Sequence, residues 1–123
     1  MIELTNEQIM AVNQSLNDLQ ESKVVLNIKV SYKLARIKKV IQSYANTIQQ
    51  EQMLLYKKYG EPEGETKIRV PAEKLDEFTN EFEELLKISN NVEIEPINVD
   101  EFGDAEIDFN IMNGLMDILE EKI

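Results

Sequence analysis

The feature that most constrains the fold is a long stripe of apolar residues between positions 32 and 59. The stripe advances in helical steps and is broken once, by the polar Glu51; its members are Leu34, Ile37, Ile41, Tyr44, Ile48 and Leu55. This spacing predicts one amphipathic helix that ends at Gly60. Such a helix is roughly 40 Å long, which is large for a chain of 123 residues. Val40 and Leu54 lie off the stripe, so a second face of the helix is partly apolar.

The best-marked shorter helix covers residues 5–21. Thr5 and Gln8 have the spacing of a capping box, in which each side chain binds the backbone of the other. Leu4 and Ile9 have the spacing of a hydrophobic staple. One face of this helix is expected to be buried, because it carries an apolar stripe made of Ile9, Val12, Leu16 and Leu19.

Two further helices are predicted nearer the C-terminus. Pro71 suits the first turn of one of them, which we expect to end at Asn90-Asn91 because asparagine tolerates the left-handed conformation. The other covers residues 108–121 and has an apolar side formed by Ile111, Leu115 and Ile118. Gly114 lies inside this last helix, where glycine costs about 1 kcal/mol relative to alanine.

Strand signals in the sequence are short. The alternation from Val24 to Val30 predicts a strand, with an extended connector as the alternative, and Ser31 would then cap the long helix. Residues 67–70 and 92–95 are also expected to be extended, and they could pair because they flank one helix. The predicted fold class is α+β and mostly α, with four helices and a small sheet of two or three short strands in a single domain, residues 1–123.

The composition argues against several classes of function. Cysteine and histidine are absent from the sequence, and the four glycines lie too far apart for a phosphate-binding loop. We therefore expect a protein that is not an enzyme and that takes no cofactor and no metal. Apolar runs fall short of the ~20 residues of a membrane span, and a secretory signal is not visible, so we expect a cytoplasmic protein without a membrane partner.

Charge is sorted along the chain. The net charge is −11, yet residues 23–59 carry +7 and residues 60–123 carry −14. Four bases are expected on the surface of the long helix, namely Lys33, Arg36, Lys38 and Lys39. We expect this basic segment to pair mainly with acidic neighbours within the fold. Direct binding of nucleic acid is not expected, although interleaved tyrosines leave single-strand binding as a weaker alternative.

The acidic half offers a contact surface for a protein partner. The residues proposed for it are Asp76, Glu77, Glu81, Glu83, Glu84, Asp100, Glu101 and Asp104. Carboxylates on a helix can be spaced somewhat like backbone phosphates, and complementary charge speeds encounter with a basic partner. The alternatives are a solvated acidic surface and, for the loop after residue 99, a divalent-cation site, although the loop lacks the ligand spacing of an EF-hand.

Several segments carry a resemblance to a known family. They are Ile28–Ala35 (IKVSYKLA), Tyr56–Glu61 (YKKYGE), Pro71–Leu86 (PAEKLDEFTNEFEELL) and Val92–Ile94. In this order they resemble a family of small, functionally uncharacterised proteins from phages and prophages of Gram-positive bacteria. The resemblance covers residues 28–95 and implies a phage origin and a short accessory gene product. The family brings no catalytic residues to carry over.

Two hypotheses for the function follow. The first is a non-catalytic phage accessory protein that binds another protein, as an acidic stoichiometric inhibitor of a host or defence nucleic-acid-binding protein in the host cytoplasm. The second is a small virion or assembly component that self-associates as a homo-oligomer through its long helix. The two differ in whether the partner is a foreign protein or a second copy of this chain.

Overall fold

The computed structural model describes residues 1–65 and 67–120 and confirms an α+β fold that is mostly helical. In this part of the chain the α-helices are α1 (Asn6–Ser22), α2 (Ile28–Tyr59), α3 (Leu75–Lys87) and α4 (Phe109–Leu115). The strands are β1 (Ile2–Thr5), β2 (Glu61–Glu63), β3 (Lys67–Arg69), β4 (Ser89–Val92), β5 (Ile97–Asn98) and β6 (Leu119–Glu120). Short 3₁₀ helices are η1 (Ala72–Lys74), η2 (Val99–Phe102) and η3 (Met116–Ile118).

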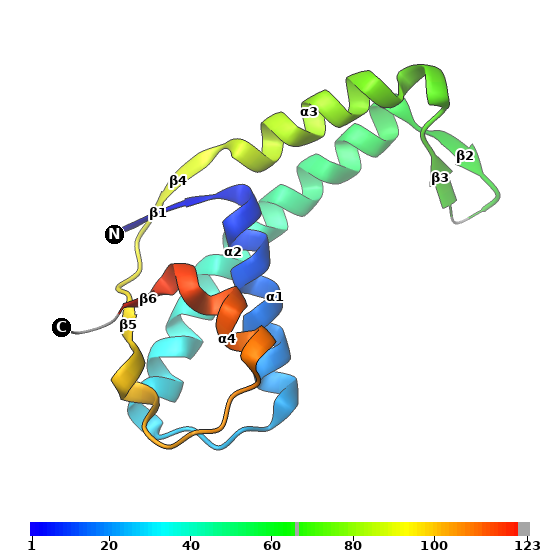
Figure 1. Cartoon of the computed structure of the whole chain (residues 1–123). Helices are drawn as coiled ribbons and strands as arrows, with labels where there is room; N and C mark the ends of the chain where they lie inside the picture. Colours follow the sequence, from blue (N-terminus) through cyan, green and yellow to red (C-terminus); the bar gives the residue numbers. More distant parts are fainter. Residues whose placement is uncertain (66, 121–123) are drawn as a thin grey trace.

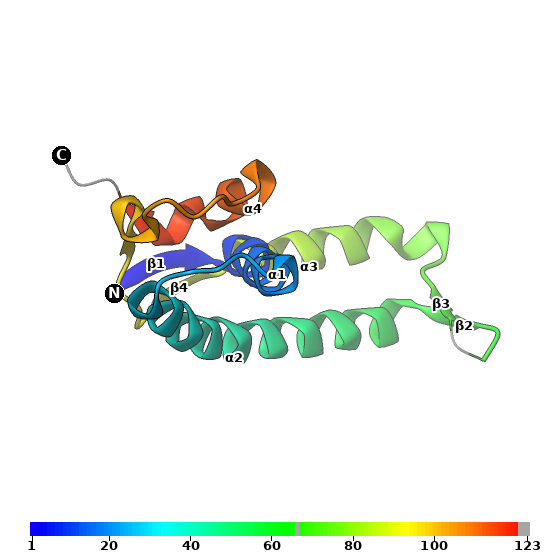
Figure 2. The ribbon, with the colours of Figure 1, turned by 90° about the horizontal axis from the view of Figure 1, so that it is seen from below.

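The body of the molecule has α1 at its centre. Figure 2 shows α1 between α2 on one side and α4 on the other, with the β1–β4 pair beside it. The predicted capping box of α1 is confirmed, since Gln8 N–H donates to Thr5 Oγ1 (3.2 Å) and Thr5 N–H donates to Gln8 Oε1 (2.8 Å). The predicted stripe of α1 is buried in the core with Leu4, the first member of the expected staple.

An arm projects from this body. It consists of the second half of α2, the β2–β3 hairpin at the far end, η1, and α3 running back alongside α2 (Figure 1). Phe78 lies at the centre of an aromatic cluster, with its ring centroid 5.1 Å from that of Tyr56, 6.3 Å from that of Tyr59 and 5.7 Å from that of Phe82. No side chain of α3 is fully buried, because α2 alone runs along it and the start of α1 meets it at its last turn.

The strands form three separate two-stranded pairs in the described chain. β1 pairs antiparallel with β4 (Ile2 opposite Val92), β2 antiparallel with β3, and β5 parallel with β6. The expected pairing of residues 67–70 with 92–95 is therefore wrong. The turn after β2 contains Gly64 at φ 78°, which lets β3 return on its immediate neighbour, and the N-terminal segment takes the place beside β4.

The start of α2 differs from the prediction. Residues 24–30 do not form a strand: residues 24–27 are a connector, and the helix begins at Ile28. Asn27 caps it, because its side chain accepts from Val30 N–H at 3.0 Å, so Ser31 lies inside the helix. Val30 then belongs to the buried helical stripe. The far boundary is correct, since Gly60 ends α2, and a Cβ at Gly60 would overlap Ile68 Cγ2.

Three other predicted elements have different bounds in the structure. α3 ends at Lys87, and Asn90-Asn91 lie in β4 rather than in a left-handed helix terminus. The segment that begins at residue 92 is buried and exposed in alternation, as expected, but only Val92 belongs to a strand. The last helix is shorter than 108–121, because α4 gives way to η3 and β6; position 121 lies outside the described residues.

Candidate protein-binding surfaces

The acidic residues of α3 form one surface. Asp76, Glu77, Glu83 and Glu84 are all exposed, and the spacing of seven residues within each pair, 76 with 83 and 77 with 84, keeps them on one side of the helix. We call these four residues the α3 acidic face. The two ion pairs among the described residues involve other groups, so these four carboxylates are free to meet a partner.

Glu81 contributes to packing within the arm and not to the α3 acidic face. Its carboxylate accepts from Lys58 Nζ at 2.9 and 3.1 Å, which joins α3 to α2 beside the aromatic cluster. Hydrogen bonds from Lys58 and from the Tyr59 hydroxyl lower the pKa of Glu81, and the same contact raises the pKa of Lys58. The structure therefore assigns Glu81 to the packing of the arm rather than to the proposed contact surface.

The remaining acidic residues lie at the other end of α2. Asp100 and Glu101 are in η2 and Asp104 follows it, next to the first turns of α2, as the ion pair between Glu101 and Lys33 shows. Lys33 and Lys58, which mark the two ends, are separated along α2 by about 38 Å. The eight acidic residues proposed from the sequence therefore do not form one continuous surface.

Glu101 joins η2 to the start of α2 through Lys33 and Asn27, and it also caps η2 through Asn98. Its carboxylate pairs with Lys33 and accepts from Asn98 N–H at 2.9 Å, and its backbone carbonyl accepts from Asn27 Nδ2 at 2.7 Å. The ion pair with Lys33 and the bond from Asn98 N–H lower the pKa of the Glu101 carboxyl. Lys33 therefore pairs within the fold, as Lys58 does with Glu81, whereas the other bases of residues 23–59 form no ion pair with the described residues.

A lowered pKa means that the contribution of Glu101 to folding is present at neutral pH and is lost as the pH falls through the folded-state pKa. We expect Glu101→Gln to lower the melting temperature at pH 7 by about 2–5 °C. The difference from the unmodified protein should shrink as the pH falls through the folded-state pKa of Glu101, which lies below the ordinary value for a glutamate. Melting followed by circular dichroism from neutral to acidic pH tests this. Asp104→Asn, an exposed change in the same loop, is the control, and a difference that persists at the acidic end contradicts the assignment.

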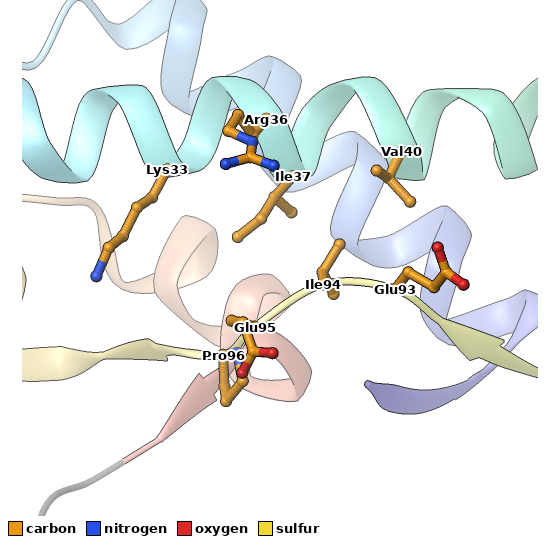
Figure 3. A pocket seen from close by; sticks show the side chains of 8 residues that line it. All are labelled: Lys33, Arg36, Ile37, Val40, Glu93, Ile94, Glu95 and Pro96. Atoms are coloured by element: carbon orange, nitrogen blue, oxygen red, sulfur yellow. The ribbon is translucent and has the colours of Figure 1, made fainter.

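The other basic residues of α2 have different environments. Lys38 donates to the Gln20 side chain on α1, and Lys39 is exposed. Lys33 and Arg36 border a groove of about 260 Å³ between α2 and the segment 93–96 (Figure 3).

The opposite side of this groove carries charge of the other sign. Glu93 and Glu95 come from the 93–96 segment, and Figure 3 shows them across from Lys33 and Arg36. Ile94 and Ile37 between them are buried. Glu93 and Glu95 were not among the predicted site residues, although their alternation with Val92 and Ile94 indicates side chains on the exposed side of an extended segment.

The described residues also bear on metal sites and on membrane-spanning helices. Within residues 1–65 and 67–120, no three carboxylates converge closely enough to hold a metal ion. Over the same part of the chain, no helix combines the length and the apolar character needed to cross a bilayer. Comparison with known protein families, with characterised proteins and with solved structures gave no match.

Proposed function

We propose that this chain is a non-catalytic, phage-type accessory protein that binds a basic, nucleic-acid-binding protein of the host through its α3 acidic face. The observation that carries the proposal is the α3 acidic face itself: four exposed carboxylates, free of ion pairs within the described chain, on a helix that projects from the body. The acidic loop around Asp100 is not part of this surface, because Glu101 ties it to α2.

The geometry of the α3 acidic face suits a partner that normally binds phosphates. Asp76 and Glu83, like Glu77 and Glu84, are separated by about 10 Å along the helix axis. The two pairs thus form two short rows of negative charge on a rod-shaped support. A basic groove would be drawn to this surface by long-range attraction, which accelerates association and weakens as salt increases.

The test is affinity capture from the lysate of a Gram-positive bacterium at low and high salt, with identification of the bound proteins. We expect basic nucleic-acid-binding proteins to be retained at low salt and released at high salt. The variant Glu77→Gln/Glu84→Gln should reduce the affinity for the captured partner by about tenfold. The matched control Asp100→Asn/Asp104→Asn removes the same charge from the other end of the molecule and should bind normally.

A second measurement distinguishes inhibition of nucleic-acid binding by the partner from binding to the partner alone. The captured partner is titrated with this protein in the presence of a fluorescent oligonucleotide, and anisotropy reports the release of the DNA. We expect stoichiometric release by the unmodified protein and by the control. The proposal is wrong if the captured proteins are not basic, if capture ignores salt, or if both double variants behave alike.

A further inference from the structure

A row of basic residues lies on an exposed side of α2, and one of them, Arg36, also borders the groove between α2 and the 93–96 segment. Figure 2 shows α2 at one edge of the structure, with α1, α3 and α4 all on its other side. Near its start, the outward side of α2 carries four exposed residues, Lys29, Tyr32, Arg36 and Lys39. The ion pairs among the described residues involve none of these four. We call them the α2 basic face.

The α2 basic face and the α3 acidic face have the same spacing. Lys29 and Arg36 are seven residues apart, as are Tyr32 and Lys39, and seven residues also separate the members of each acidic pair on α3. On both helices this spacing is about 10 Å along the axis. Residues 28–39 include no acid, and residues 76–84 include no base. Two helices lying side by side could therefore match the charges of one face to those of the other along more than two turns.

The two faces cannot meet within one copy of the chain. The α3 acidic face lies on the arm, beside the second half of α2, whereas the α2 basic face begins at the first turn of that helix (Figure 1). Lys58, which pairs with Glu81 on α3, is about 28 Å along the helix from Lys39. Each face is thus left exposed in the monomer, and each would find its complement on a second copy.

We propose that the α2 basic face of one copy binds the α3 acidic face of another, in a head-to-tail contact. In this contact the bases of α2 lie beside the carboxylates of α3. The Tyr32 hydroxyl reaches the amide of Asn80, which lies between the two acidic pairs and is exposed. Each copy then keeps one unused face, so the contact extends into chains or closes into a ring.

Apolar area adds to the charge complementarity at this contact. Ile28 is 81% exposed and Tyr32 is 63% exposed, and the two lie one turn apart on the outward side of α2. Docking of α3 would cover part of both side chains beneath the aliphatic stems of the glutamates. This burial supplies affinity that does not depend on salt, which the exposed ion pairs alone would not give.

The surroundings of the α2 basic face favour a second copy over a long nucleic acid. Asp100 and Asp104 lie next to the first turns of α2, and Glu93 and Glu95 border the groove beside Arg36. A helix of two to three turns needs only the length of the basic row, whereas a longer polyanion would continue toward these acids and be repelled by them. At about 0.1 M salt the Debye length is about 10 Å, so the facing charges dominate over the repulsion between two acidic molecules.

The first test is sedimentation velocity of the full chain over a wide range of protein concentration at about 0.1 M and 0.5 M NaCl. We expect species larger than a dimer at the lower salt concentration and a shift toward monomer at the higher one. Arg36→Gln/Lys39→Gln should weaken the association by at least about tenfold. The matched control Lys57→Gln/Lys74→Gln removes the same charge from exposed positions on the arm and should not weaken it. A monomer under all conditions, or equal loss in both variants, overturns the proposal.

The second test mixes two variants that each lack one face. Arg36→Gln/Lys39→Gln keeps the acidic face, and Glu77→Gln/Glu84→Gln keeps the basic face. Each variant alone should remain monomeric at concentrations where the unmodified protein assembles. The equimolar mixture should form a dimer and nothing larger, because it contains one intact pair of faces. Failure of the mixture to dimerise would contradict a head-to-tail contact between these two faces.

The inference shares the α3 acidic face with the proposed function but does not rest on it. Arg36→Gln/Lys39→Gln should still capture the basic partner, since only its other face is changed; loss of self-association with retained capture separates the two proposals. A labelled single-stranded oligonucleotide, titrated at low salt and followed by anisotropy, tests the competing use of the α2 basic face. Oligonucleotide binding that Arg36→Gln/Lys39→Gln abolishes, in a chain that stays monomeric, would assign this face to nucleic acid and overturn the inference.

Discussion

Replacing Gly114 with alanine is expected to lower the free energy of unfolding by about 2–3 kcal/mol. A Cβ added at Gly114 would overlap Ser15 Oγ and lie 2.9 Å from Ser15 Cβ. Ser15 is buried on α1, so α4 must move away from α1 to relieve the clash. Helix propensity alone predicts the opposite sign, a gain of about 1 kcal/mol. The sign of the change therefore shows whether close packing of α1 on α4 outweighs local helix preference.

Urea denaturation followed by circular dichroism measures this effect, and a second substitution identifies its source. Ser15→Ala removes the oxygen but leaves a Cβ at 2.9 Å, so it should restore part of the stability lost in Gly114→Ala. Asn113→Ala, an exposed change in the same helix, should stay within about 0.5 kcal/mol of the unmodified protein. A Gly114→Ala variant as stable as the original chain would contradict this account of the α1–α4 contact.

Local sequence signals predicted the helices well because their determinants are close together in the chain. The capping box of α1 needs only Thr5 and Gln8, and the buried stripe of α2 needs only its own spacing. Both depend on neighbours within one or two turns. Gly114 could not be interpreted from local signals alone. Glycine lowers helix propensity at this position, but a larger residue would collide with Ser15, which is distant in the sequence.

The strands were predicted poorly because their partners are distant in the chain. Val24–Val30 alternates like a strand, yet Asn27 caps a helix there, and Val30 is buried on the helical stripe of α2. The alternating apolar residues from Val24 to Val30 favour a strand, but the longer helical repeat of α2 begins within this segment and determines its structure. The pairing of β4 with β1 joins two segments that are more than 80 residues apart, and no local pattern specifies it.

The acidic surface was predictable in part. Spacing on α3 places the acidic residues at 76, 77, 83 and 84 on one side of a helix, and the structure shows that side exposed. Glu81 and Glu101 do not belong to this exposed surface, because they form ion pairs with Lys58 and Lys33. These pairs depend on how distant segments pack and could not be deduced from spacing.

The four bases predicted on the surface of α2 do not form one row. Lys33 is exposed but pairs with Glu101, and Lys38 is half-buried and donates to Gln20. Lys29 was not predicted to lie on this surface, because the alternation around it predicted a strand. Only a continuous helix places Lys29 and Arg36 on the same side. The error at the start of α2 therefore carried over into the candidate site.

The junction between the arm and the body depends on one buried polar side chain. Asn6 is 5% exposed; its Nδ2 donates to the Leu85 carbonyl at 2.7 Å, and its Oδ1 accepts from Asn90 Nδ2 at 2.8 Å. Its backbone N–H also donates to the Ile88 carbonyl at 2.9 Å. The side chain thus joins the start of α1 to the end of α3 and to β4, three segments that meet where the arm begins.

Asn6→Ala is therefore expected to lower the free energy of unfolding by about 2 kcal/mol, because it removes two side-chain hydrogen bonds of about 1 kcal/mol each. The Leu85 carbonyl keeps the bond from Ile88 N–H, and Asn90 Nδ2 keeps the Leu4 carbonyl. Hydrogen exchange should show the loss of protection first in the amides of α3 and β4, and later in the centre of α1. Asn91→Ala, an exposed change in β4, is the matched control and should alter neither measurement. Uniform loss of protection across α1, α3 and α4 would instead mean that the arm and the body unfold together, and that Asn6 contributes to the whole core rather than to the junction.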